Sequence, residues 1–164
     1  MSALYDQIQE LAARYPSSRS AIMPALHLAQ DQHGWLPPEA LREVADALDL
    51  TPAYVMGVAS FYDMYDLAPT GKHKIAVCTN VSCALNGAQD VVEAFEQELG
   101  IATGDTTEDG EFSLTTFECL GGCGWATVVA LDWRYRERVS AGDVPGIVAE
   151  LRGDAPAQTE EPAE

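Results

Sequence analysis

The spacing of apolar residues changes once along the chain, and this change constrains the fold more than any other feature of the sequence. Before the stretch Ala68-Pro69-Thr70-Gly71, apolar residues recur every three or four positions, which is the spacing of amphipathic helices. After this stretch, short apolar runs bounded by turn signals alternate with helical segments. The sequence therefore predicts an α+β protein, with an N-terminal helical bundle over residues 1–67 and a second domain over residues 72–152.

The expected elements follow from apolar spacing together with capping residues and helix breakers. In the N-terminal part, the pattern predicts four helices, over about residues 4–15, 20–33, 38–48 and 51–59. In the second part, it predicts strands over residues 73–77, 112–117, 126–132 and 133–139, and helices over about residues 87–99 and 143–151. Residues 153–164 offer nothing large and apolar to bury, so they are expected to form a disordered acidic tail.

The chain is strongly acidic, which bears on its partners and its compartment. It has 9 Lys and Arg residues against 26 Asp and Glu residues, a formal net charge of −17. Nucleic acids and anionic membranes bind clusters of Lys and Arg, so neither is expected as a partner. The sequence shows no signal peptide and no apolar run near the roughly 20 residues that span a bilayer. We therefore expect a cytoplasmic protein without direct membrane insertion, whose thiols stay reduced.

Four cysteines in two pairs are the residues best suited to bind a metal. Cys78 and Cys83 are spaced C-x4-C, and Cys119 and Cys123 are spaced C-x3-C. Each pair follows a predicted strand, so both loops are expected to emerge at the same end of a sheet. The loops are rich in small residues, which let backbone N–H groups approach the sulfurs. Four thiolates are also the ligand set of a [2Fe–2S] cluster.

Spacing alone leaves other uses of four cysteines open. A structural zinc site also takes four thiolates, and the x4 and x3 spacings fit the range of such sites loosely. Two disulfides are compatible with the count, although a reducing cytoplasm disfavours them. A thioredoxin-type redox pair requires C-x-x-C, which the sequence lacks.

Five segments of the sequence together resemble one known family. They read CTNVSCALNGA (residues 78–88), TTEDGEFSL (106–114), ECLGGC (118–123), AQDQHGWLP (29–37) and VASFY (58–62). In their order along the chain they resemble the 24 kDa subunit family of respiratory complex I, the NuoE-like, thioredoxin-like [2Fe–2S] ferredoxins. The resemblance covers nearly the whole chain, up to about residue 152.

The resemblance implies a function for the cysteines and a place for the chain in a larger enzyme. It implies that one [2Fe–2S] cluster is held by four ligands, Cys78, Cys83, Cys119 and Cys123. It also implies a thioredoxin-like domain from about residue 72, preceded by a helical bundle that packs on a flavoprotein. In such complexes the flavoprotein binds NADH and FMN, and the cluster exchanges single electrons with the flavin. The chain would then be an electron-transfer subunit of NADH:quinone oxidoreductase, with further iron–sulfur subunits, at the cytoplasmic face of the inner membrane.

No catalytic site is expected on this chain itself, because it lacks the glycine-rich nucleotide motifs and any arrangement that resembles a catalytic triad. Within the family, the alternative is the equivalent subunit of an NAD-reducing hydrogenase or an NAD-dependent formate dehydrogenase. From a different class, the alternative is a zinc-stabilised interaction module.

Two residues beside the cysteines depart from the family pattern. Gly122 stands where the family usually has Ala, and Thr127 stands where it usually has Pro. Neither change removes a cysteine. Trp125, which follows Cys123 by two residues, is expected to shield a bound cluster from water.

Two further groups of residues receive structural expectations. Arg134, Arg136 and Arg138 alternate along a predicted strand, which places them on one face of either a solvated edge strand or a docking surface. The three histidines are scattered, and we expect structural positions for them: His27, His33 and His73.

Overall fold

The computed structural model describes residues 2–153 and divides the chain into two compact units, Met1–Thr70 and Gly71–Glu164. The boundary between the units falls inside the Ala68–Gly71 stretch. Apart from its first residue, the predicted acidic tail at 153–164 lies outside the described residues. No helix in the described part of the chain is long and apolar enough to cross a membrane.

The first unit contains the four expected helices. They are α1 (Ala3–Ala12), α2 (Ile22–His33), α3 (Pro38–Leu48) and α4 (Pro52–Phe61), with a short 3-10 helix η1 (Ser18–Ala21) before α2. The prediction that the first helix reaches Tyr15 was wrong, because the chain tightens after Ala12. The N–H groups of Arg14 and Tyr15 bond to carbonyls three residues back, at 3.0 Å each, instead of four.

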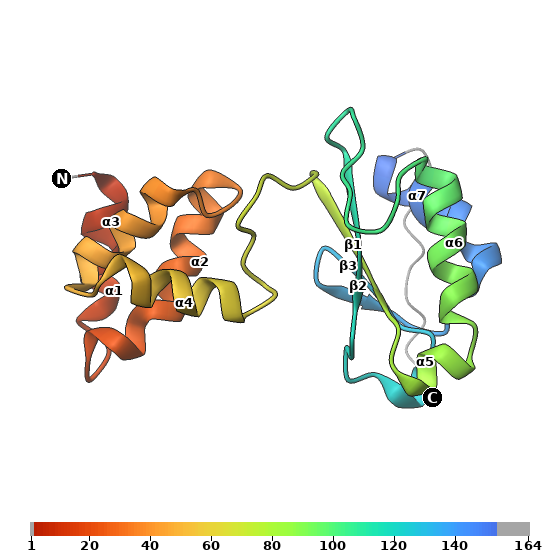
Figure 1. Ribbon diagram of the computed structural model, residues 1–164, viewed down its shortest axis with the longest axis horizontal. Helices are drawn as coiled ribbons and strands as arrows, with labels where there is room; N and C mark the ends of the chain where they lie inside the picture. Colours follow the sequence, from red (N-terminus) through yellow and green to blue (C-terminus); the bar gives the residue numbers. More distant parts are fainter. Residues whose placement is uncertain (1, 154–164) are drawn as a thin grey trace. The chain divides into compact units, whose positions relative to one another are not determined.

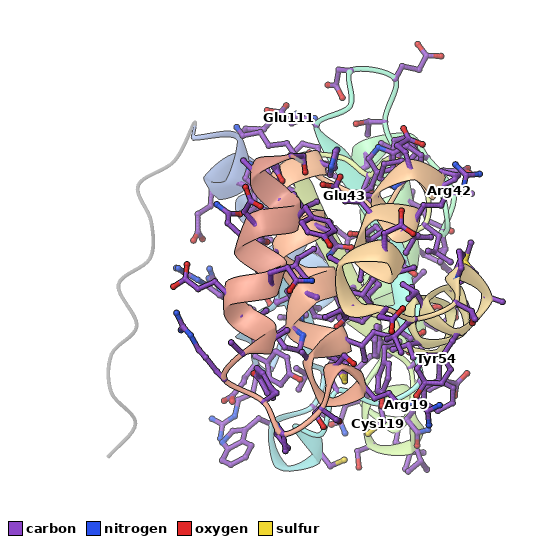
Figure 2. All side chains as sticks on the ribbon, turned by 90° about the vertical axis from the view of Figure 1, so that its left-hand side faces the viewer. Arg19, Arg42, Glu43, Tyr54, Glu111 and Cys119 are labelled. Carbon is purple, nitrogen blue, oxygen red and sulfur yellow. The ribbon has the colours of Figure 1, made fainter. Side chains whose placement is uncertain are left out.

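One apolar core holds this unit together. Leu4 and Ile8 of α1, Leu26 of α2 and Val44 of α3 are buried in it, among several alanines that let the helices approach closely. At the surface, Figure 2 shows Arg19 beside Tyr54, whose ring centroid lies 5.4 Å from the guanidinium carbon. This contact ties η1 to α4, and the segment after α4 packs on the same core.

The second unit is a four-stranded mixed sheet with helices on one face (Figure 1). Its strands are β1 (His73–Cys78), β2 (Phe112–Phe117), β3 (Val129–Leu131) and β4 (Arg134–Arg136), in the order β2-β1-β3-β4. Its helices are α5 (Val81–Leu85), α6 (Ala88–Leu99) and α7 (Val144–Arg152), with two 3-10 helices, η2 (Cys123–Trp125) and η3 (Ala141–Asp143). Strand β1 pairs with β2 in parallel and with β3 antiparallel, and β3 pairs with β4 antiparallel.

The alternation of side chains along β1 divides the core of this unit in two. Ile75 and Val77 point toward α6 and α7 and are fully buried in the larger apolar cluster. Ala76 and Cys78 point the other way, because successive strand residues face opposite sides of a sheet. They belong to a smaller cluster that also contains Leu120 and lies under the cysteine loops.

The third and fourth strands are shorter than the sequence predicts. The expected strands 126–132 and 133–139 are reduced to Val129–Leu131 and Arg134–Arg136. The tight turn between them is confirmed, since Asp132 and Trp133 both have positive φ angles, of 49° and 65°. At the far end, Arg138 has a φ of 52°, which is incompatible with an extended strand and ends the pairing.

This shortening changes the prediction for the three arginines. Arg138 lies outside the strand, so the three side chains do not alternate on one strand face. Arg136 donates to both carboxylate oxygens of Glu150 on α7, at 2.8 and 3.0 Å. Only the edge position of β4 is as expected. Arg136 is committed to holding α7 on the sheet and is not free for a partner.

Candidate metal centre

The parallel pairing of β1 and β2 brings the two cysteine loops to the same edge of the sheet. Cys78, the last residue of β1, lies opposite Phe117, the last residue of β2. Parallel strands end on the same side, so the loops that follow them begin side by side. The expectation that both cysteine pairs emerge at one end of a sheet is confirmed. All four cysteines therefore lie near this edge of the sheet.

The first loop folds into a short helix that buries Cys83. Asn80 caps this helix, α5, because its side-chain oxygen accepts a hydrogen bond from the N–H of Val81 at 2.7 Å. Cys83 lies on the inner side of the helix and is 2% exposed, and Cys78 is 3% exposed. Sequence analysis predicted no helix here, although Asn80 followed by apolar residues was a signal for one.

The second loop leaves its cysteines at the surface. Cys119 and Cys123 are both exposed, and Cys119 is labelled in Figure 2. Gly121 adopts a φ of 81°, which favours glycine, and its N–H points at the sulfur of Cys119 across 3.4 Å. The chain then enters η2 at Cys123, a second short helix that sequence analysis did not predict.

Backbone N–H groups donate to the two buried sulfurs, and the pKa values of the two thiols shift in opposite directions. Burial raises the pKa of Cys78, but hydrogen bonds from the backbone of Leu120 and Asn80 and from two neighbouring thiols outweigh it, so the pKa is lowered. Burial raises the pKa of Cys83, and the N–H of Val128 offsets this only in part. Cys78 is therefore the more readily ionised of the pair.

The four sulfurs are neighbours without converging on one point. The thiol of Cys78 hydrogen-bonds with those of Cys83 and Cys119, and the charge of Cys123 acts on Cys83. In the described part of the chain, no three His, Cys, Asp or Glu side chains form a single-ion site. A [2Fe–2S] cluster distributes four ligands over two irons. The chemistry of this donor set, four thiols with N–H donors directed at the sulfurs, fits such a cluster.

The histidines lie apart from the cysteines. His73 begins β1, at the end of the strand opposite Cys78, and its Nδ1 lies 2.8 Å from a carboxylate oxygen of Asp132. His27 packs its ring against Tyr65, with centroids 5.0 Å apart, in the helical unit. His33 lies in the last turn of α2. These are the structural positions that the sequence predicts.

A family model matches most of the chain, over residues 8–152, and its description is thioredoxin-like [2Fe–2S] ferredoxin. The chain belongs to this family. The family implies a [2Fe–2S] cluster, and the fold and the cysteine loops described above agree with that membership.

Individual relatives come from more than one kind of enzyme. The chain is 42% identical over 150 residues to NADH-quinone oxidoreductase subunit 2 of Thermus thermophilus, which covers 90% of this chain and 83% of that protein. It is 38% identical over 147 residues to the NADP-reducing hydrogenase subunit HndA of Solidesulfovibrio fructosivorans, which covers 90% of this chain and 86% of that protein.

A solved structure of an NAD+-reducing [NiFe]-hydrogenase is similar in fold. It superimposes with a TM-score of 0.72 at 22% sequence identity, and the match covers 82% of this chain but only 23% of that one. At this identity the likeness extends to the fold alone. The matched fold is thus one part of a much longer chain in that enzyme.

Proposed function

We propose that Cys78, Cys83, Cys119 and Cys123 hold one [2Fe–2S] cluster, and that the chain is an electron-transfer subunit of NADH:quinone oxidoreductase. The observation on which this depends is the meeting of the two cysteine loops at the shared end of the parallel strands β1 and β2. The family membership and the 42% identity to an NADH-quinone oxidoreductase subunit support it. When bound, such a cluster accepts and releases one electron at a time.

In this proposal, the residues of this chain bind the cluster and set its reduction potential, and none of them is assigned a catalytic step. The backbone N–H groups of Leu120, Asn80 and Val128 donate to the sulfurs of the buried pair. Donors at sulfur stabilise negative charge, so they favour the reduced state and raise the reduction potential. Burial of Cys78 and Cys83 excludes water from one side of the site.

The electron partner in this proposal is the FMN of a flavoprotein subunit that also binds NADH. Further iron–sulfur subunits of the same complex would accept electrons beyond it, and the complex would lie at the cytoplasmic face of the inner membrane. A second candidate is the equivalent subunit of an NAD(P)-linked hydrogenase, which the 38% identity to HndA favours. The subunits that co-purify with the tagged chain decide between them: quinone oxidoreductase subunits support the first, and hydrogenase subunits the second.

The cluster itself is tested on the purified protein. We expect a red-brown visible spectrum that bleaches on reduction, with about two irons and two acid-labile sulfides per chain. Colourless protein with one zinc per chain would overturn the proposal in favour of a zinc-stabilised module.

The ligand set is tested by serine substitutions with a matched control. Cys119→Ser and Cys83→Ser should each abolish or strongly change the visible and EPR spectra, because a ligand of the cluster is lost. Ala84→Ser introduces the same hydroxyl at an exposed position beside Cys83 and should leave the spectra unchanged. An unchanged spectrum in a cysteine variant would remove that cysteine from the ligand set.

A further inference from the structure

Thr127 is the one polar residue in the described part of the chain that is buried, with 1% of its surface exposed. Its hydroxyl donates toward the carbonyl of Asn86 at 3.1 Å and lies 3.5 Å from the carbonyl of Cys83. Both acceptors belong to the end of the first cysteine loop. A buried hydroxyl is costly unless it is bonded, so this contact fixes the side chain of Thr127 against that loop.

We propose that Thr127 is a positioning residue for Cys83, and that its hydroxyl holds the C-terminal end of α5 in place beside the cluster. This inference rests on the proposed function of the four cysteines. Thr127 itself touches no metal in the proposal. It acts through the backbone of residues 83 and 86.

The helix that bears Cys83 is short and is held mainly at its two ends. Helix α5 is five residues long, too short to be stable by its own hydrogen bonds. At its C-terminal end, Asn86 and Gly87 donate to the carbonyls of residues 82–84, and the hydroxyl of Thr127 adds a donor from a distant segment at the carbonyl of Asn86. Two apolar residues of α5, Val81 and Leu85, are largely exposed, Leu85 to 82%, so burial of its side chains anchors it weakly. A donor at its C-terminal end therefore matters more than in a longer helix.

The backbone around Thr127 reaches the other buried cysteine as well. The carbonyl of Val128 accepts a hydrogen bond from the N–H of Cys78 at 3.0 Å, and the N–H of Val128 bonds to the sulfur of Cys83. The carbonyl of Thr127 accepts from the N–H of Val139 at 2.9 Å, which anchors this segment to the rest of the unit. Thr127 and Val128 thus contact both segments that bear the buried cysteines, and so fix Cys83 relative to Cys78.

The test compares Thr127→Val with Thr127→Ser in the cluster-loaded full chain. Valine keeps the shape of threonine without the donor, whereas serine keeps the hydroxyl. We expect Thr127→Val to lose its cluster to a ferric chelator about tenfold faster than the unsubstituted protein and to shift the EPR g values of the reduced cluster. Thr127→Ser should stay within about twofold of the unsubstituted protein. Thr115→Val, which removes an exposed hydroxyl bonded only to the adjacent residue's carbonyl in the described contacts, is the matched control and should change neither readout.

Other outcomes of this experiment would overturn the positioning role of Thr127. Normal EPR and chelator rates in Thr127→Val, or equal damage in Thr127→Ser, would overturn the positioning role while the proposed function stands. A lower unfolding midpoint with unchanged g values would assign Thr127 a merely structural role and overturn the proposal too. If Thr127→Val does not accumulate, Thr127→Ala takes its place with the same expectations. Absence of iron and sulfide in the unsubstituted protein would remove both proposals.

Discussion

The two cysteine loops serve one proposed site but are built in opposite ways. The first loop places Cys78 at the end of a central strand and Cys83 on a capped helix, and both side chains are buried. The second loop presents Cys119 and Cys123 at the surface on a backbone that contains three glycines. The position of one pair is therefore fixed by the core of the sheet unit, whereas the position of the other depends on the conformation of a glycine-rich loop.

The two pairs also differ in the hydrogen-bond donors directed at their sulfurs. The buried pair has backbone donors directed at its sulfurs. The exposed pair has a single N–H near one sulfur, that of Gly121, among the described contacts. We expect the first loop to be the more rigid half of the site and the second loop to be the more accessible half. The following predictions test this division of roles.

The largest difference is expected in the reactivity of the thiols once iron is removed. In the reduced apoprotein, Cys119 and Cys123 should react with iodoacetamide about 100-fold faster than the buried pair, if buried thiols react only through local opening of about 3 kcal/mol. Cys83 should be the slowest of the four. Its pKa is raised by burial, so it holds less thiolate near neutral pH than Cys78, whose pKa is lowered. Mass spectrometry of a timed labelling series measures all four rates.

Equal rates for the four thiols would contradict this comparison, because they would show that the first loop opens as readily as the second. A useful control is the same series in denaturant. There the burial of Cys78 and Cys83 is lost and the four rates should converge.

The second prediction concerns the stability of the apoprotein. Cys78→Ser and Cys83→Ser each place a hydroxyl in a buried position and should lower the free energy of unfolding by about 1–3 kcal/mol. Cys119→Ser and Cys123→Ser change exposed side chains and should stay within about 0.5 kcal/mol. Urea unfolding, followed by tryptophan fluorescence, measures the four values. Similar losses at all four positions would show that the exposed loop is as much part of the fold as the buried one.

A single contact between the second cysteine loop and the segment that follows it gives the third prediction. A Cβ atom added at Gly122 would lie 2.8 Å from Cγ2 of Val128, which is closer than real contacts allow. Gly122→Ala should therefore cost about 1–3 kcal/mol of unfolding free energy through overpacking. In a Val128→Ala background the same change should cost about 1 kcal/mol less, because the methyl group that blocks it is gone. Strict additivity of the two substitutions would show that the cost of Gly122→Ala does not arise from the contact with Val128.

The same contact explains one departure from the family pattern. Val128 is fully buried in the small cluster under the cysteine loops, and its side chain occupies the space that an alanine at position 122 would need. The sequence alone showed that Gly122 differs from the family, but the side chain that disfavours alanine there belongs to a residue six positions further along the chain. Such a pair is visible only once the loop has been folded back on the strand.

The parts of the fold that sequence analysis predicted well are those with strong periodic signals. The helix starting at Pro52 was marked by Thr51, whose side chain does cap it, and Gly100 does end α6 in a left-handed conformation. The sequence also predicted that both cysteine loops begin at the same end of the sheet, because a predicted strand directly precedes each cysteine pair. These signals are local and do not depend on distant contacts.

The errors fall where distant contacts override the local pattern. Residues 126–128 read as part of a strand, but the side chain of Thr127 turns to the end of α5, and the sheet pairing starts only at Val129. The pattern predicted Arg136 on one face of a solvated edge strand or a docking surface, but Arg136 pairs with Glu150 on a helix that lies later in the chain. The burial of one cysteine pair and the exposure of the other also had no counterpart in the spacing of the cysteines.

The smallest effect is expected at Trp125, whose position tests whether the exposed loop contributes packing of its own. Its side chain is 49% exposed, while its backbone N–H bonds to Gly122 and its carbonyl accepts from Arg138, at 2.9 Å each. Because the loop is held there by backbone groups, Trp125→Ala should change the free energy of unfolding by no more than about 0.5 kcal/mol. The same variant should label faster at Cys123, by about twofold, if the indole covers that thiol, and not at all faster at Cys83. A loss of more than 1 kcal/mol would show instead that the exposed loop is fixed by its side chains, and the contrast with the buried loop would then be one of accessibility alone.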